Sequence, residues 1–129
     1  MIINNKSIRE LHFDHELWLA EMTFWKQEID ILDKYLAAVI VSLSDTDSRG
    51  EVDHYQNQFF IQRNFINSLK NDVKAQEKLI SQLENDISNR LLQKKKADDE
   101  YEIRDKMLTN EKLYNELKMS FKKWLSNKL

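Results

Sequence analysis

The fold is decided by residues 8–43, which read IRELHFDHELWLAEMTFWKQEIDILDKYLAAVIVSL. Apolar or aromatic residues and one histidine recur in this stretch at alternating steps of four and three: Leu11, His15, Trp18, Met22, Trp25, Ile29, Leu32, Leu36, Val39 and Leu43. This spacing is the heptad seam of a helix that packs against other helices. The seam therefore predicts one long helix from Ser7 to Leu43.

A second file of apolar residues follows the same helix at intervals of seven: Leu17, Phe24, Ile31 and Ala38. At about 3.6 residues per turn, this file projects roughly 100° away from the Trp18, Trp25 and Leu32 positions of the seam. The apolar arc is wider than one partner helix can cover. We therefore expect neighbours on more than one side and take this helix as the central packing surface.

The composition predicts an all-α fold in a single domain over residues 1–129. With no proline, one glycine and 33% charged residues, the chain lacks the turn residues that a sheet requires. The net charge of −2 offers no basic excess for nucleic acid. The absence of cysteine is compatible with a reducing compartment. The amino end lacks a signal-peptide core and no apolar run approaches the ~20 residues of a membrane span, so we expect a soluble, cytoplasmic protein without a membrane partner.

Two capping boxes predict where the first two helices begin. Ser7 stands three residues before Glu10, and Ser48 stands three residues before Glu51, so each hydroxyl can accept a hydrogen bond from the amide of the acid. The polar run at residues 44–48 separates the two helices.

The second helix is predicted from Arg49 to about Asn89 and the third from about Asp98 to Ser126, with a break between Asn89 and Ala97. The third seam comprises Ile103, Met107, Asn110, Tyr114, Leu117, Phe121 and Trp124. Acidic residues at its start and lysines at its end match the helix dipole. Three long helices with short links predict an up-down-up antiparallel bundle.

The strongest candidate metal ligands are His12 and His15, which share one helix face, where two imidazoles can chelate a transition metal. An approximate antiparallel register brings three acids near them: Glu84, Glu100 and Asp105. The simpler interpretation is that His15 is a seam histidine bonded to one acid and that His12 lies at the surface. We adopt it and expect no cofactor.

Other positions with possible chemistry have structural explanations. His54 completes a single E-x-x-H with the capping residue Glu51, but it lies about 40 Å from the other histidines at 1.5 Å per residue. Glu21 and Glu28 lie between the two apolar files, where we expect each to pair at the rim with a lysine of the third helix. No glycine-rich phosphate loop or nucleophile–base set occurs in the sequence, so we expect no enzyme activity.

Three segments carry a further likeness: Leu11-His12-x-x-His15-x-x-Trp18, residues 24–29 (FWKQEI) and residues 51–63 (EVDHYQNQFFIQR). In these segments the chain resembles a family of small uncharacterised bacterial all-helical proteins. The resemblance covers about the first two thirds of the chain, and it implies a soluble helical protein without an assigned activity. Members of that family often carry a histidine where this chain has Asn71 and another near Asp99, which argues against an inherited metal site.

The sequence also predicts an interface at the end of the bundle where the first helix meets the second. Folding the third helix back from a turn near Gln93 brings its last residues level only with about Phe59, which leaves two helices beyond that level. Residues 37–43 (AAVIVSL) are apolar on nearly all sides. A monomer would then expose more apolar surface than soluble monomers tolerate. We therefore expect a two-fold dimer, with a foreign protein as the rival partner, through six residues: Val39, Ile40, Leu43, Tyr55, Phe59 and Phe60.

The predicted function is that of a non-enzymatic structural or interaction protein, which self-associates or binds a protein partner through exposed apolar helix faces. The alternative is a bundle that binds iron, manganese or zinc for redox or storage chemistry.

Overall fold

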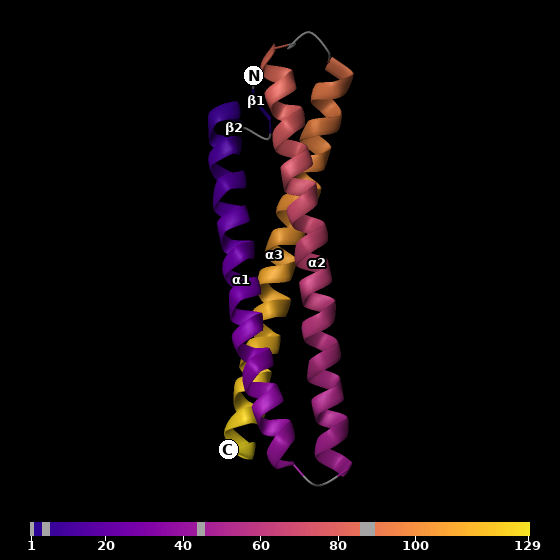
Figure 1. The fold of residues 1–129 in the computed structure, drawn as a ribbon. Coiled ribbons are helices and arrows are strands. Elements are labelled where there is room, and N and C mark those ends of the chain that lie inside the picture. Colours follow the sequence, from indigo (N-terminus) through magenta and orange to yellow (C-terminus); the bar gives the residue numbers. More distant parts are fainter. Residues whose placement is uncertain (1, 4–5, 44–45, 86–89) are drawn as a thin grey trace.

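The structure is a bundle of three long antiparallel helices with a short strand pair at its amino end (Figure 1). The computed structural model describes residues 2–3, 6–43, 46–85 and 90–129. Helix α1 spans Ile8–Ser42, α2 spans Thr46–Asn85 and α3 spans Arg90–Lys128. Strand β1 (Ile2–Ile3) pairs antiparallel with β2 (Lys6–Ser7). The predicted all-α fold of three long helices is confirmed.

Both predicted ends of the first helix are confirmed. The Ser7 hydroxyl accepts a hydrogen bond from the Glu10 amide at 3.2 Å and caps α1. At the other end, the Leu43 amide donates to the carbonyls of Val39 and Ile40, and Leu43 itself leaves the helix.

The predicted start of the second helix is wrong. Helix α2 begins at Thr46 and not at Arg49, so Ser48 lies inside the helix and is not its cap. The buried Ser48 hydroxyl instead accepts a hydrogen bond from Nζ of Lys128 in α3, at 3.0 Å. A contact between distant elements has replaced the local cap that the spacing indicates.

The predicted break between Asn89 and Ala97 is also wrong, because α2 ends at Asn85 and α3 begins at Arg90. The seam of α3 continues in four-three steps before Ile103 through Glu100 and Lys96, and both side chains are buried. Charged residues at two seam positions conceal the first turns of this helix from an analysis of apolar periodicity.

The longer α3 closes the far end of the bundle, which corrects the predicted two-helix end. Trp124 Nε1 donates a hydrogen bond to the carboxylate of Glu51, and the hydroxyls of Tyr55 and Ser120 lie 2.7 Å apart. The Phe121 ring stands edge-on to Tyr55, with their centroids 5.2 Å apart. All three helices therefore contribute to the core at this level.

The main core runs along the bundle and buries the seam residues of every helix: Met22, Trp25, Ile29, Leu36, Val52, Tyr55, Phe59, Ile66, Leu69, Val73, Ile103, Met107, Tyr114 and Phe121. A smaller cluster of Ile8, Leu11 and Ile80 lies at the other end of the bundle. Within the described residues, no helix combines the length and apolarity needed to cross a membrane.

Candidate functional site

A layer of buried polar residues connects all three helices. His15 of α1 is fully buried, and its Nδ1 and Nε2 are hydrogen-bonded to Glu77 of α2 and Glu100 of α3, respectively. Nδ1 of His12 lies 2.8 Å from the same Glu77 carboxylate. Gln76 donates to Oε1 of Glu100 at 3.3 Å. The layer arises because seam positions of three helices meet at one level and carry polar side chains.

The surroundings of His15 favour the imidazolium form. Burial lowers the pKa of His15, but the hydrogen bonds and charges of Glu100 and Glu77 outweigh it and raise the pKa above its ordinary value. With both nitrogens protonated, the ring donates to both carboxylates. Oε2 of Glu100 is buried without a hydrogen-bond partner among the described residues.

The candidate metal ligands do not all converge. Glu100 meets His15, whereas Asp105 is exposed and bonds to neither histidine, and the side chain of Glu84 lies outside the described residues. Within the part of the chain that the structure describes, no three His, Cys, Asp or Glu side chains are placed to share a metal ion. His54 is exposed on α2, with its ring against Tyr55.

Sequence reasoning missed Glu77. The signal was available, because folding the second helix back about a turn near Thr46 places residue 77 level with His15. The acid was overlooked because Gln76, and not Glu77, occupies the seam position.

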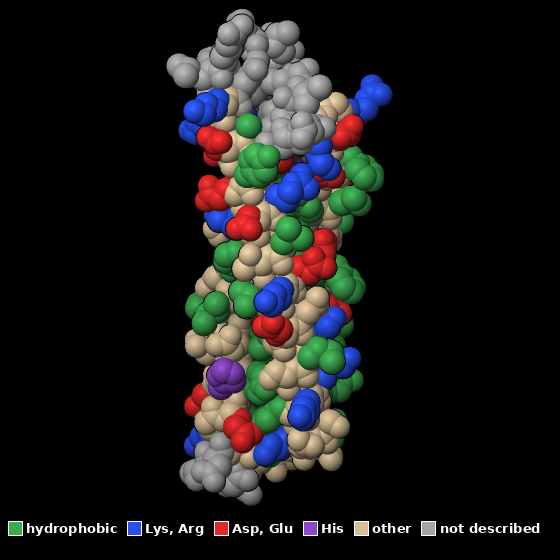
Figure 2. All heavy atoms as spheres, turned by 180° about the vertical axis from the view of Figure 1, so that it is seen from behind, with side chains coloured by type: hydrophobic (Ala, Val, Ile, Leu, Met, Phe, Trp, Pro, Cys, Tyr) green, Lys and Arg blue, Asp and Glu red, His purple; other side chains and the backbone are tan. Residues whose placement is uncertain are grey.

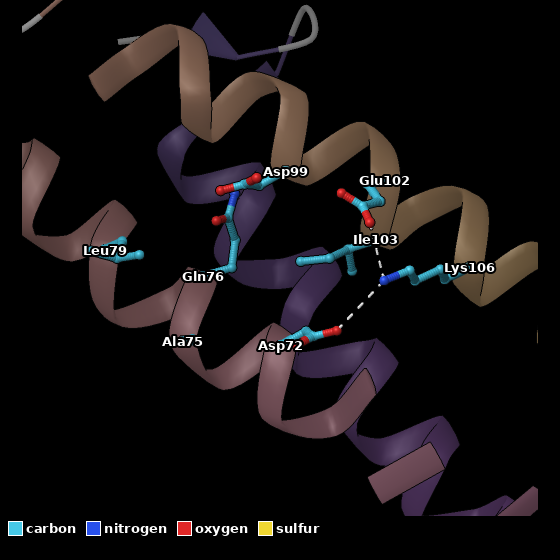
Figure 3. Close-up of a pocket in the computed structure, with 8 residues that line it drawn as sticks. All are labelled: Asp72, Ala75, Gln76, Leu79, Asp99, Glu102, Ile103 and Lys106. Atoms are coloured by element: carbon cyan, nitrogen blue, oxygen red, sulfur yellow. Dashed lines mark ion pairs between the residues drawn. The ribbon is translucent and has the colours of Figure 1, made fainter. Parts of the chain in front are cut away.

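A shallow hollow of about 270 Å³ lies between α2 and α3 beside this layer (Figure 3). Three of its lining residues are acidic: Asp72, Asp99 and Glu102. Lys106 forms ion pairs with Glu102 at 3.2 Å and with Asp72 at 3.8 Å. Because charges of both signs pair within the hollow, it resembles ordinary solvated surface more than a charged ligand site.

The most unusual surface is on α1. Besides Val41 near its end, five of its large apolar side chains are at least half exposed: Phe13 (60%), Leu17 (52%), Phe24 (53%), Ile31 (55%) and Tyr35 (51%). Together with the exposed Ala20 and Ala38, they fall within about 60° of one another at 3.6 residues per turn. We call these seven residues the α1 stripe. It includes the whole second file of the sequence, so the expectation that neighbouring helices of the chain cover this file is wrong: Leu17, Phe24 and Ile31 are more than half exposed.

The α1 stripe points away from the core of the chain, because the neighbouring helices are tied to other faces of α1. On the α3 side, Lys118 forms an ion pair with Glu28 at 3.1 Å, which confirms the expected lysine partner of Glu28. On the α2 side, Arg63 donates to Asp33 at 2.8 Å. In Figure 2, hydrophobic side chains recur down the upper and middle right-hand edge, along which α1 runs.

The surroundings of Glu21 differ from the pairing with a lysine of the third helix that the sequence predicts. It borders the stripe in a small hollow between α1 and α3, and Glu111 lines the same hollow. No cation pairs with Glu21 within the described residues, so the expected lysine partner is wrong. Burial and then the charge of Glu111 raise the pKa of Glu21.

The six predicted interface residues separate into two groups. Val39, Tyr55 and Phe59 are buried in the core of their own chain and are not available to a partner. Phe60 and Ile40 are exposed, at 61% and 38%, and Leu43 is partly buried. The shift of α3 toward the far end places Phe121 against Tyr55 and Phe59.

Comparisons of the chain with protein-family models, curated proteins and solved structures found no match. The resemblance of the three sequence segments to a family of helical proteins therefore stays a prediction.

Proposed function

We propose that the protein is a non-enzymatic interaction module that binds a helix of a protein partner along the α1 stripe. One observation carries this proposal: five large apolar side chains line a single face of a helix whose seam is already packed in the core. Isolated exposed apolar residues are ordinary on soluble proteins, but a continuous file of them marks a contact surface.

The spacing of the α1 stripe fits a helical partner in particular. Its members follow one another at steps of four or three, with a gap at Gln27 and with Tyr35 in place of the alternating position 34: Phe13, Leu17, Ala20, Phe24, Ile31, Tyr35 and Ala38. This is the periodicity of a seam that receives the side chains of another helix. Helix α1 thus has two seams, of which one is buried within the chain.

The area of the α1 stripe reaches the lower limit for a biological contact. An aromatic side chain carries 150–250 Å², so the five large side chains at half exposure present roughly 500 Å² per chain. A partner of equal apolarity would bring the buried total to about 1,000 Å², which is the lower limit for a biological interface.

The proposal can be tested with a photo-crosslinking amino acid in cells. Benzoyl-phenylalanine at position 24 should give a discrete protein adduct after irradiation, because Phe24 is central in the stripe. The matched control is position 60, since Phe60 is also an exposed phenylalanine, at 61% compared with 53%, but lies on α2. An adduct at position 24 and none at position 60 supports the proposal. No adduct at position 24, or equal yields at both, rejects the proposal.

A further inference from the structure

The α1 stripe is symmetric about its own midpoint. If the helix is reversed about the point between Trp25 and Lys26, Phe13 falls level with Ala38 and Ala20 falls level with Ile31. In the same reversal, Leu17 falls within one residue of Tyr35. A two-fold axis generates this relation, because residue i of one copy then meets residue j of the other and j meets i.

The pairing of sizes in this register is complementary. Each large side chain at the pairs 13–38 and 20–31 meets an alanine, so the two surfaces interdigitate at these two pairs, and Phe24 falls level with Gln27 between them. A parallel pair of α1 helices would instead place Ala20 on Ala20 and Phe13 on Phe13. In that arrangement, two small side chains leave a gap at residue 20, and two large side chains overlap at residue 13.

The charges beside the α1 stripe favour the same direction. Glu16 and Lys34 are both exposed, lie on one flank of the stripe and have no ion-pair partner within the described residues. The reversed register brings Glu16 of one copy within one residue of the level of Lys34 of the other, twice per dimer. A parallel pair would instead place Glu16 beside Glu21 of the other copy, by the usual flanking contact of parallel coiled coils.

The opposite flank does not reverse this preference. The antiparallel register brings Glu21 near the level of Glu28 of the second copy. Glu28 already carries Lys118 at 3.1 Å, so its charge is balanced within its own chain.

We propose that the partner of the α1 stripe is a second copy of this chain, packed antiparallel with α1 on α1 about a two-fold axis between Trp25 and Lys26. This inference rests on the proposed function, since it names the helix that occupies the stripe. The contact runs from Phe13 to Ala38, a length of about 37 Å at 1.5 Å per residue.

The first test exchanges the sizes of one contact pair. Ala20→Ile and Ile31→Ala, made separately, should each weaken dimerisation about tenfold in sedimentation equilibrium, because the first overfills the contact and the second empties it. Both changes in one chain should restore dimerisation to within about threefold of the parent, because Ile and Ala again meet across the two-fold axis. Both residues are exposed, so helicity measured by circular dichroism should stay constant.

The second test fixes the direction with cysteines, which the natural chain lacks. Chains carrying Ala20→Cys and chains carrying Ile31→Cys should form a disulfide-linked dimer only when mixed and oxidised. When only one of the two variants is present, the two equivalent cysteines of the antiparallel dimer lie about 16 Å apart along the helix axis, which is beyond the reach of a disulfide. The control is Phe60→Cys mixed with either chain, which should not cross-link.

The outcomes separate this inference from the proposed function. Cross-links in each single-cysteine chain alone, or a double swap that stays weak, would show parallel pairing and overturn the inference. A monomer at high micromolar concentration, with an adduct to a different protein at position 24, would retain the interaction module and reject the second copy. A monomer without any adduct would reject both.

Discussion

At the scale of single residues, the imidazole of His15 lies fully buried between the carboxylates of Glu77 and Glu100. Replacing His15 by Leu removes the cation and leaves Glu100 buried without a counter-charge. We expect a loss of about 3–5 kcal/mol in the free energy of unfolding, which is typical of a broken buried ion pair. Urea unfolding followed by circular dichroism measures this loss.

The control for this prediction removes both charges. A double variant His15→Leu, Glu100→Leu should recover most of the loss, because apolar pairs often replace buried ion pairs at little cost. If the double variant is as unstable as the single one, the loss of stability in His15→Leu comes from altered packing and not from an unpaired buried charge.

The raised pKa of His15 predicts how the free energy of unfolding depends on pH. Its pKa is raised in the folded state by Glu100 and Glu77 despite burial, so the folded protein holds the proton more tightly than the unfolded chain. The stabilisation is complete below the unfolded value of about 6.5 and is lost as pH rises through the higher folded pKa. Urea midpoints should therefore fall as pH rises above about 6.5 in the parent and change less in the double variant. Equal slopes in the two proteins would contradict this role.

Part of this layer was predictable. A histidine at a seam position must find a hydrogen-bond partner when buried, and that requirement predicts an acid beside His15. The second acid, Glu77, follows only from the axial level of α2, since it lies outside the seam. Periodicity identifies which residues face the core, whereas the partners of a polar residue depend on register.

At the scale of one element, the Ser7 cap sets the start of α1. Ser7→Ala removes the acceptor of the Glu10 amide and should cost about 1 kcal/mol of stability. The matched control is Ser68→Ala, an exposed serine within α2, which should change stability by less than about 0.5 kcal/mol. Thermal unfolding compares the two, and hydrogen exchange should show faster exchange at the first turn of α1 in Ser7→Ala alone. Equal losses in both variants would show that the hydroxyl of Ser7 does not act as a cap.

The helix boundaries differ in how far the sequence determines them. The start and end of α1 follow from local chemistry, namely the Ser7 cap and the polar residues after Leu43. The start of α3 does not, because Lys96 and Glu100 are charged residues at buried seam positions. Buried charges are rare unless they are paired, so a sequence pattern reads such positions as solvent-exposed. Glu100 is paired with His15 of α1, whereas Nζ of Lys96 pairs with Asp99 of α3 itself at 3.5 Å.

At the scale of the whole molecule, the number of helices and their antiparallel order could be predicted from the sequence. The axial register of α3 could not. The earlier start of α3 moves its end past the predicted level of Phe59, to the contact between Trp124 and Glu51. This shift buries Tyr55 and Phe59 of the predicted interface against Phe121 and leaves the α1 stripe as a regular exposed apolar file among the described residues. The second file of α1 was visible from the sequence, but its exposure became evident only once α2 and α3 were placed.

The acid beside the α1 stripe gives a prediction for the whole assembly. The pKa of Glu21 is raised by burial and by Glu111, so its carboxylate destabilises the fold once it is ionised. The stabilisation from its protonated form is present below the unfolded value of about 4.3 and is lost as pH rises through the higher folded pKa. Glu21→Gln should therefore raise the melting temperature at pH 7 by about 2–4 °C and have little effect near pH 4.

The same change should tighten self-association at pH 7, since Glu21 approaches the level of Glu28 of the second copy in the antiparallel register. We expect a few-fold lower dimer dissociation constant at pH 7, measured by sedimentation equilibrium and accompanied by a weaker dependence on salt, because screening matters less once the charge is gone. The matched control is Glu116→Gln, an exposed acid of α3 outside the hollow, which should change neither property. An equal gain in melting temperature at pH 4 and pH 7 would show that Glu21→Gln acts through packing, whereas unchanged dimerisation would place Glu21 away from the contact between the two copies.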